Sequence, residues 1–308
     1  ASDWSSDVCS SDLSGPLHLG NIGCCLLAYL SARAQGGRFL VRVEDLDWQR
    51  CPRPLGLQAL SDLKTLGFDW DEEPLWQSQR DAVYQAALSQ LAAHVYPCFC
   101  TRASLLASQA PNLGDTQSVY AGTCRNLTRE QILQKSALRS PALRLRVPDL
   151  TIAFTDGLQG EVSENLSESC GDFIVRRSDG LWGYQLAVVV DDGASHVTEV
   201  VRGRDILTAT PRQIYLASLL GYPSPVYVHI PLLLAPDGRR LAKRDRDLGL
   251  SALLNRLTPQ ALLGHLAFAY GIIKKPEAIS LPELVSVFDW SLVPRQDVCL
   301  PSALLEGL

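Results

Sequence analysis

Residues 14–21 and the apolar run 22–34 that follows them constrain the fold more than any other part of the chain. The segment reads Ser-Gly-Pro-Leu-His-Leu-Gly-Asn, and it precedes a run that predicts a helix, which Gly36 and Gly37 would end. Backbone N–H groups at a helix start lack intrahelical partners and carry partial positive charge, so this arrangement suits a phosphate group. The alternative is an ordinary Gly-Pro loop that only caps a helix.

From residue 22 onward the chain alternates between helical and β-rich runs. Residues 39–43 form a short β-rich run that enters the acidic segment 44–47, as a buried strand would. The run 183–192 ends in two aspartates and predicts another buried strand. Further helices are predicted at 52–66, 80–95, 211–220 and from 251 onward, and further strands at 143–147, 152–154, 198–202 and 226–234.

Residues 98–178 differ in texture from the rest, because they are irregular, polar and contain cysteines. A compact α/β unit interrupted by an insertion explains this order better than two tandem domains. We therefore expect a catalytic domain split between 14–97 and 184–247, an insertion at 98–183 and a helical C-terminal region at 248–308.

Residues 1–13 stand apart. The triplet Ser-Ser-Asp occurs there twice, and the segment shows neither helical nor strand periodicity. The chain also contains no Met, so we expect that its first residue is not a native start. We predict that residues 1–13 are a non-native segment in place of the true N-terminus.

Composition narrows the class of protein. The 308 residues are 46% hydrophobic, which is enough for a sizeable core. The net charge of −5 argues against non-specific binding of nucleic acid through a general positive coat, although a local basic face is compatible with it. The sequence has no apolar run of the roughly 18 residues that a membrane span needs and no secretory signal pattern, so we expect a soluble, cytoplasmic protein.

Three of the nine cysteines, Cys98, Cys100 and Cys124, lie in a short stretch together with Tyr120. Clustered cysteines in a reduced compartment predict metal ligands before disulfides, and zinc takes four ligands that often include thiolates. No histidine lies between Cys100 and Cys124, so the fourth ligand must come from elsewhere, and the Tyr120 phenolate is one candidate. Such a zinc would be structural. Three unrelated free cysteines are the alternative.

Three charged positions are candidates for substrate binding. Glu44, after a strand end, could hold an ammonium group, and Arg202 could pair with a substrate carboxylate. Lys243, in the basic loop 238–244, could neutralise charge that develops during phosphoryl or adenylyl transfer. The alternatives are a solvated acidic turn, a structural ion pair of Arg202 with an aspartate at 191–192, and a solvated basic turn.

Taken together, the ordered motifs resemble those of the class I aminoacyl-tRNA synthetases of the glutamyl type. Residues 14–21 resemble the HIGH motif, residues 42–47 the Arg-x-Glu-Asp-x-Asp segment, and residues 240–244 a degenerate KMSKS loop. The match runs from residue 14 to about residue 245. It implies an α/β fold with a Rossmann-type parallel sheet, a zinc-containing insertion that resembles an acceptor-binding domain, and a short helical C-terminal region.

Within that family the chain is most similar to the short paralogues of glutamyl-tRNA synthetase. The Cys-x-Cys…Tyr-x-x-x-Cys pattern, the run 183–192 and the Val-Arg-Gly at 201–203 carry this resemblance, and only about 60 residues follow the KMSKS-like loop. It implies activation of L-glutamate with ATP and magnesium through a glutamyl-adenylate. The glutamate then passes to the queuosine base in the anticodon region of tRNA(Asp). We expect a monomer with no membrane partner.

The resemblance also implies a role for each candidate residue. No general base is needed, because the glutamate carboxylate is already a nucleophile, so catalysis would rest on alignment and charge neutralisation. The implied ATP-binding residues are His18, Gly20, Asn21 and Lys243, of which His18, Asn21 and Lys243 are the catalytic ones. The implied glutamate-binding residues are Glu44, Tyr184 and Arg202, and the implied zinc ligands are Cys98, Cys100, Tyr120 and Cys124.

The chain departs from the family pattern before the HIGH-like motif. The family's first strand, of the form Arg-Phe-Ala-Pro-Ser-Pro-Ser-Gly, should end at Gly15, but residues 8–13 do not reproduce it and its glutamate-binding arginine is absent. Ala242 replaces the usual serine of the KMSKS loop. Two alternatives stay open: a truncated glutamyl-tRNA synthetase that charges tRNA(Glu) without zinc, and a catalytically inactive, zinc-stapled tRNA-binding paralogue.

Overall fold

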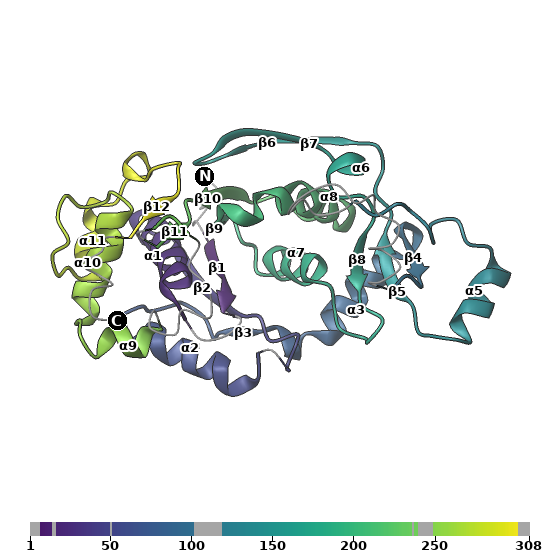
Figure 1. Cartoon of the computed structure of the whole chain (residues 1–308), viewed down its shortest axis with the longest axis horizontal. Coiled ribbons are helices and arrows are strands. Elements are labelled where there is room, and N and C mark those ends of the chain that lie inside the picture. The colour runs from purple at the N-terminus through teal and green to yellow at the C-terminus, as the bar shows by residue number, and fades with distance from the viewer. Residues whose placement is uncertain are drawn as a thin grey trace.

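The structure is a computed structural model that describes residues 7–13 (backbone only), 17–49, 51–101, 119–235, 237–239 and 249–300. Along the long axis, helices near the C-terminus lie at one end, a parallel sheet lies in the middle and a small antiparallel sheet lies at the other end (Figure 1). The mixed α/β content predicted from the sequence is confirmed. Within the described ranges, no helix is both long and apolar enough to cross a lipid bilayer.

Five strands form the central sheet: β1 (Asp7–Leu13), β2 (Arg38–Val43), β3 (Leu75–Trp76), β9 (Glu199–Gly203) and β10 (Val226–Ile230). Their order is β10-β9-β1-β2-β3, and every neighbouring pair is parallel. The first strand therefore lies in the middle, and the winding of the chain reverses between β1 and β9. In open parallel sheets, ligands bind at the carboxyl ends of the strands beside such a reversal.

The segment before the HIGH-like motif supplies the central strand of this sheet. β1 pairs with β2 along one edge and with β9 along the other, where Val8 is opposite Glu199. The sequence of this segment shows neither helical nor strand periodicity, yet residues 7–13 form a strand. Pairing on both edges sets the conformation of a central strand, so local side-chain alternation is a weak guide to it. That this segment is non-native stays a prediction.

The two faces of the sheet are covered by different elements. Phe39 and Val201 belong to the core on the face covered by α1 (Leu19–Ala34), which is buried along most of its length. Leu40 and Val200 point to the opposite face and pack with Ile214 of α8 (Thr210–Leu220). This alternation follows the two-residue period of a strand.

Helices α2 (Arg53–Thr65) and α3 (Asp81–Gln90) confirm helices expected from the sequence, although α3 ends before residue 95, where a further strand begins. The run 183–192, predicted as a strand, is instead the helix α7 (Tyr184–Ala194), so that prediction is wrong. Residues 186–192 are all buried. A short apolar run that is buried on every side has no period that separates strand from helix.

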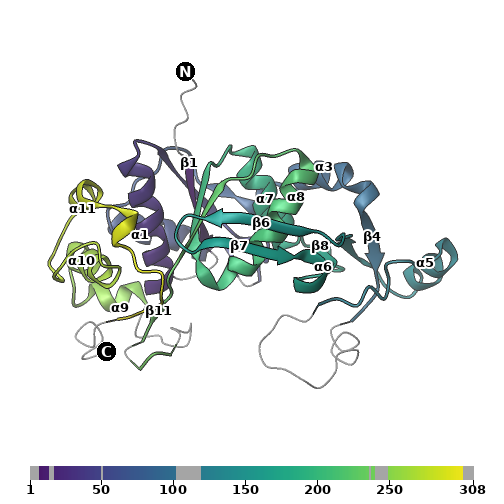
Figure 2. The ribbon, with the colours of Figure 1, turned by 90° about the horizontal axis from the view of Figure 1, so that it is seen from above.

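The insertion contains more regular structure than its texture predicted. β4 (Val95–Cys98), β5 (Ala142–Leu145) and β8 (Phe173–Arg176) form an antiparallel sheet near α5 (Arg129–Ser136). β6 (Thr151–Asp156) and β7 (Gly160–Asn165) form a hairpin that runs from the short helix α6 (Leu166–Ser169) back along α8 towards β10 (Figures 1 and 2). The strands expected near 143–147 and 152–154 are confirmed, whereas α5, β7 and β8 were not predicted.

Helices α9 (Leu250–Leu254), α10 (Pro259–Ala269) and α11 (Leu281–Val287) follow the leucine spacing predicted after residue 251, and α10 and α11 pack on α1 (Figure 2). A Cβ at Gly23 of α1 would lie 2.5 Å from the hydroxyl of buried Tyr270, so the glycine allows this close approach. β11 (Leu233–Leu234) pairs in parallel with β12 (Val298–Cys299). Short 3-10 turns are η1 (Gln77–Gln79), η2 (Ala92–His94), η3 (Arg204–Ala209) and η5 (Trp290–Leu292).

Candidate active site at the carboxyl edge of the sheet

Three of the predicted site residues lie at one edge of the central sheet. Because the strands are parallel, their carboxyl ends meet at the same edge. His18 follows β1, Glu44 follows β2, and Arg202 is the penultimate residue of β9. The fold therefore brings residues that are distant in sequence to the edge where ligands of such sheets bind.

His18 is the N-cap of α1. Its Nδ1 accepts hydrogen bonds from the backbone N–H groups of Gly20 at 3.1 Å and Asn21 at 3.4 Å. In return, Oδ1 of Asn21 accepts a hydrogen bond from the backbone N–H of His18 at 3.4 Å. This reciprocal cap holds three of the predicted ATP-binding residues as one unit at the positive end of the helix dipole.

The start of α1 lies beside Gly249, a residue downstream of the basic loop. The backbone of His18 forms an isolated β-bridge with Gly249. Residues 14–16 and 240–248, including the candidate Lys243, lie outside the described residues. The bridge places Gly249, which follows the KMSKS-like segment by five residues in the sequence, beside His18 of the HIGH-like motif.

Glu44 is nearly buried and lies against Arg42. Oε1 of Glu44 is 3.5 Å from Nη2 of Arg42, and Nη1 of Arg42 donates to the carboxylate of Asp192 in α7. The side chains of Arg42 and Glu44 are only 3% and 9% exposed, so this chain of contacts restricts Glu44 and ties β2 to α7. A solvated acidic turn is therefore wrong for Glu44.

The other two acidic residues after β2 have structural partners. Asp45 accepts hydrogen bonds from the backbone N–H of Ser78 at 2.9 Å and from its hydroxyl at 2.5 Å. Asp47 lies 3.4 Å from Nη1 of Arg177. These contacts attach the loop that carries Glu44 to η1 and to the segment before α7.

Asp191 is a buried acceptor for three donors. It accepts hydrogen bonds from Nε2 of Gln77 at 2.9 Å, from Nε of Arg80 at 2.6 Å and from the hydroxyl of Tyr84 at 2.8 Å. Burial and the neighbouring Asp191 charge raise the pKa of Tyr84, so its hydroxyl stays protonated and donates. Asp191 was predicted to follow a strand, but it lies in the last turns of α7 and binds α3 and η1.

Tyr184 is the first residue of α7 and is partly buried. Gly183, the N-cap of α7, lies close to β8. A Cβ at this position would lie 2.5 Å from the carbonyl oxygen of Ile174. The glycine therefore permits the close packing that positions the start of α7.

Arg202 is fully buried at the end of β9. Its Nε donates to Nε2 of His229 at 3.0 Å, and its Nη2 donates to Oγ1 of Thr210 at 2.7 Å. The guanidinium carbon lies 5.0 Å from the centre of the Tyr227 ring. No described residue offers a hydrogen-bond acceptor to Nη1, and no described carboxylate forms an ion pair with Arg202. The predicted alternative of a structural ion pair with an aspartate at 191–192 is therefore wrong.

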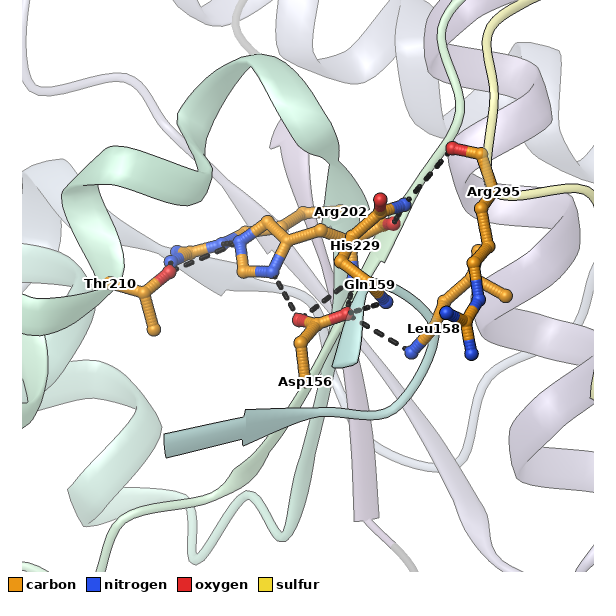
Figure 3. Close-up of polar contacts among 7 residues, drawn as sticks. All are labelled: Asp156, Leu158, Gln159, Arg202, Thr210, His229 and Arg295. Carbon is orange, nitrogen blue, oxygen red and sulfur yellow. Dashed lines mark hydrogen bonds and ion pairs between the residues drawn. The ribbon is translucent and has the colours of Figure 1, made fainter. Parts of the chain in front are cut away.

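His229 of β10, which accepts from Arg202, forms a buried pair with Asp156 of β6 (Figure 3). Nδ1 of His229 lies 2.5 Å from Oδ2 of Asp156, whose Oδ1 accepts the backbone N–H groups of Leu158 at 3.0 Å and Gln159 at 2.8 Å. Burial lowers the pKa of His229. Burial alone would raise the pKa of Asp156, but hydrogen bonds from His229 and Gln159 hold it below its usual range. A neutral His229 therefore carries its proton on Nδ1, which leaves Nε2 as an acceptor for Arg202.

Asp156, Thr210 and His229 are not among the residues predicted from the sequence to form the site. The one available signal was a histidine in the apolar strand run 226–230, which indicates a polar group with a buried partner. The identity of that partner could not be read from the sequence, because Asp156 and His229 are 73 residues apart.

The predicted zinc ligands come together in the insertion. The Sγ atoms of Cys98, Cys100 and Cys124 lie within 4.8 Å of one another, and those of Cys100 and Cys124 are 3.7 Å apart. The Tyr120 hydroxyl lies 3.6 Å from Sγ of Cys98 and 3.7 Å from Sγ of Cys100. Zn–S bonds of about 2.3 Å in a tetrahedron separate two sulfurs by about 3.8 Å, so these four groups fit a metal of that kind.

A metal requires thiolates, and hydrogen-bond donors favour the thiolate form of Cys98, whereas burial and the neighbouring Cys124 and Cys98 raise the pKa of Cys100 to about 11. The backbone N–H of Phe99 donates to Sγ of Cys124 at 3.4 Å, and Nε of Arg144 donates to Sγ of Cys98 at 3.3 Å. Burial alone would raise the pKa of Cys98, but hydrogen bonds from the Cys100 backbone, Tyr120 and Arg144 hold it below its ordinary value.

Comparisons with known sequences identify relatives along nearly the whole chain. The family model of the tRNA synthetases class I (E and Q), catalytic domain, matches residues 12–269. The glutamyl-Q tRNA(Asp) synthetase of Symbiobacterium thermophilum is 45% identical, over 96% of this chain and 95% of its own length. The protein of the same name from Nitratidesulfovibrio vulgaris is 44% identical with the same coverage.

Solved structures share the fold at lower identity. The glutamate-tRNA synthetase of Elizabethkingia anophelis superimposes with a TM-score of 0.83 and 23% identity, covering 97% of this chain and 69% of that chain. A glutamate tRNA ligase of Elizabethkingia meningosepticum, solved with its amino acid, gives a TM-score of 0.82 and 24% identity, covering 97% of this chain and 68% of that chain. At these identities the likeness concerns the fold alone.

Proposed function

The chain belongs to the class I tRNA synthetase family of the E and Q type, and we propose that it activates L-glutamate with ATP and transfers it to the queuosine base of tRNA(Asp). One observation carries this proposal. Two relatives that are named glutamyl-Q tRNA(Asp) synthetase match the chain at 44% and 45% identity over 95% of their own length.

In the first step, a carboxylate oxygen of glutamate attacks the α-phosphorus of ATP. The new O–P bond forms the glutamyl-adenylate, and the bond to the β-phosphate breaks to release pyrophosphate. Glu44 binds the ammonium group of glutamate, Arg202 binds a carboxylate through its unpaired Nη1, and Tyr184 completes the pocket. Catalysis rests on holding the two reactants in line, which can remove roughly 7–11 kcal/mol of the barrier.

We place ATP at the N-terminus of α1. His18, Gly20 and Asn21 contact it there, and the parallel sheet acts as a Rossmann-type nucleotide-binding sheet. Lys243 stabilises the negative charge that develops at phosphorus. Magnesium accompanies the phosphates. In the second step, a hydroxyl of the queuosine base attacks the acyl carbon, and AMP leaves.

We also propose that Cys98, Cys100, Tyr120 and Cys124 hold a structural zinc ion. When bound, zinc would cross-link the end of β4 to the segment 119–124. The support is the tetrahedral spacing of the three thiols and the phenol, together with the donors that favour the thiolate form of Cys98.

The function is tested with radiolabelled glutamate. We expect glutamate-dependent exchange of pyrophosphate into ATP, and transfer of label to tRNA(Asp) that contains queuosine but not to tRNA(Asp) that lacks it. Label on tRNA(Glu) would favour a truncated glutamyl-tRNA synthetase instead. Binding of tRNA without exchange would favour an inactive paralogue. A variant that carries the family's first-strand sequence at residues 8–15 separates the effect of the altered sequence of this strand from absence of the function.

A further inference from the structure

We propose that His229 is a positioning residue for the glutamate-binding arginine, and that Asp156 of the β6–β7 hairpin selects the histidine tautomer that does this. The assignment of Arg202 to glutamate rests on the proposed function. The contacts of His229 with Arg202 and with Asp156 do not.

The guanidinium plane of Arg202 is held by two neighbouring side chains. Arg202 has three nitrogens in one rigid plane, and two of them are already held by His229 and Thr210. Fixing Nε and Nη2 fixes the direction of Nη1, which has no hydrogen-bond partner among the described residues. The buried pair of acceptors therefore aims the remaining donor before any ligand arrives.

The partners of His229 determine which of its ring nitrogens carries the proton. Arg202 can only donate, so Nε2 of His229 must be bare to accept its hydrogen bond. The Asp156 carboxylate can only accept, and it faces Nδ1. The hydroxyl of Thr210 lies 3.1 Å from Nε2 and can donate to it while accepting from Arg202 (Figure 3). All contacts are satisfied only when the proton lies on Nδ1.

Asp156 belongs to the β6–β7 hairpin. Asp156 is the last residue of β6 and lies in the insertion. Further hydrogen bonds attach the hairpin to β10. The backbone N–H of Gly157 donates to the Tyr227 carbonyl at 2.8 Å, and Nε2 of Gln159 donates to the His229 carbonyl at 2.7 Å. The insertion thus contributes directly to the rear of the amino-acid pocket, in addition to any role in tRNA binding.

The central test is Asp156→Asn. Oδ1 of Asp156 accepts three backbone N–H groups, from Leu158, Gln159 and His229, so the asparagine oxygen is expected to keep that place and to turn its amide N–H towards Nδ1. The proton of His229 would then move to Nε2 and face the N–H of Arg202. In glutamate-dependent pyrophosphate exchange, we expect the KM for glutamate to rise on the order of 10- to 100-fold, with the KM for ATP within about 2-fold of wild type.

Two histidine variants separate positioning from packing. The oxygen of His229→Gln reaches the place of Nε2 and can still accept from Arg202, whereas His229→Asn reaches only the place of Nδ1. We expect His229→Gln to retain glutamate affinity better than His229→Asn. Thr155→Ala is the matched control, because Thr155 precedes Asp156 in β6 but is exposed and bonds only to Glu161 among the partners observed.

Several results would overturn the proposal. Equal KM values for glutamate in wild type and Asp156→Asn would do so, as would equal losses in the two histidine variants or a parallel rise in the KM for ATP. Nitrogen NMR of the His229 ring in the wild-type protein gives a reading that does not depend on any variant folding, and a proton on Nε2 would refute the proposal. Absence of glutamate exchange in wild type would instead count against the proposed function.

Discussion

Replacing Asp191 by alanine should destabilise the protein strongly, because three donors converge on this carboxylate. Asp191 has no exposed surface, and neither has the side chain of Tyr84 that donates to it. The substitution leaves the Tyr84 hydroxyl and the nearly buried Gln77 amide without an acceptor, at about 1–3 kcal/mol each. Arg80 is 22% exposed, so water compensates most of its lost partner.

These losses sum to about 2–6 kcal/mol, against a total free energy of unfolding of roughly 5–15 kcal/mol for a typical domain. Asp191→Asn retains one acceptor oxygen and should lose about half as much. Urea unfolding followed by tryptophan fluorescence measures the effect, and Trp182 is a suitable probe because its ring centre lies 5.7 Å from that of Tyr84.

The matched control is Asp149→Ala. Asp149 is exposed and accepts one hydrogen bond, from Nδ2 of Asn165 at 2.6 Å, so its removal should cost less than about 0.5 kcal/mol. If Asp191→Ala lowered the free energy of unfolding by less than about 1 kcal/mol, the reasoning from buried, unpaired donors would be refuted for this helix.

Three further predictions concern the metal, the substrate and pH. Cys124→Ala should release the zinc, and an unchanged metal content by elemental analysis would count against the site. Arg202→Lys should raise the KM for glutamate at least about tenfold in pyrophosphate exchange, because an ammonium cannot hold two acceptors and a ligand in one plane; an unchanged KM would contradict this. Burial holds the pKa of His229 below its ordinary 6.5, so the unfolded chain takes up the proton first as the pH falls. Stability should therefore be fully present above about pH 6.5 and decline below it, and His229→Gln should weaken this slope in urea unfolding between pH 5 and 8. His265, whose pKa is also lowered by burial, would account for a remaining slope; an unaltered slope in the variant would exclude His229 as its source.

Local signals predicted the elements around the site well. The helix after residue 18 and the strand that ends at residue 43 follow from capping residues and from apolar periodicity, which act over a few neighbours. The cysteine spacing also predicted a cluster that the structure contains. These patterns carry their own physical cause within a short stretch of chain.

Contacts between distant parts of the chain determine the structure of the elements that were not predicted from the sequence. The strand at residues 7–13 depends on neighbours on both edges, and α7 is buried so completely that its residues lack a polar face. The surroundings of Arg202 come from three elements, and only the folded hairpin brings Asp156 to His229. A hydrogen bond between residues 73 positions apart leaves no mark in either local pattern.

The parallel pairing of β11 with β12 joins the two ends of the intervening segment 235–297 through backbone hydrogen bonds. Val298 N–H donates to the Leu232 carbonyl at 3.0 Å, and Leu300 N–H donates to the Leu234 carbonyl at 2.9 Å. A tryptic cut after the exposed Lys274 should therefore nick the chain without separating its parts. Both fragments should elute as one species under native conditions and separate only in denaturant.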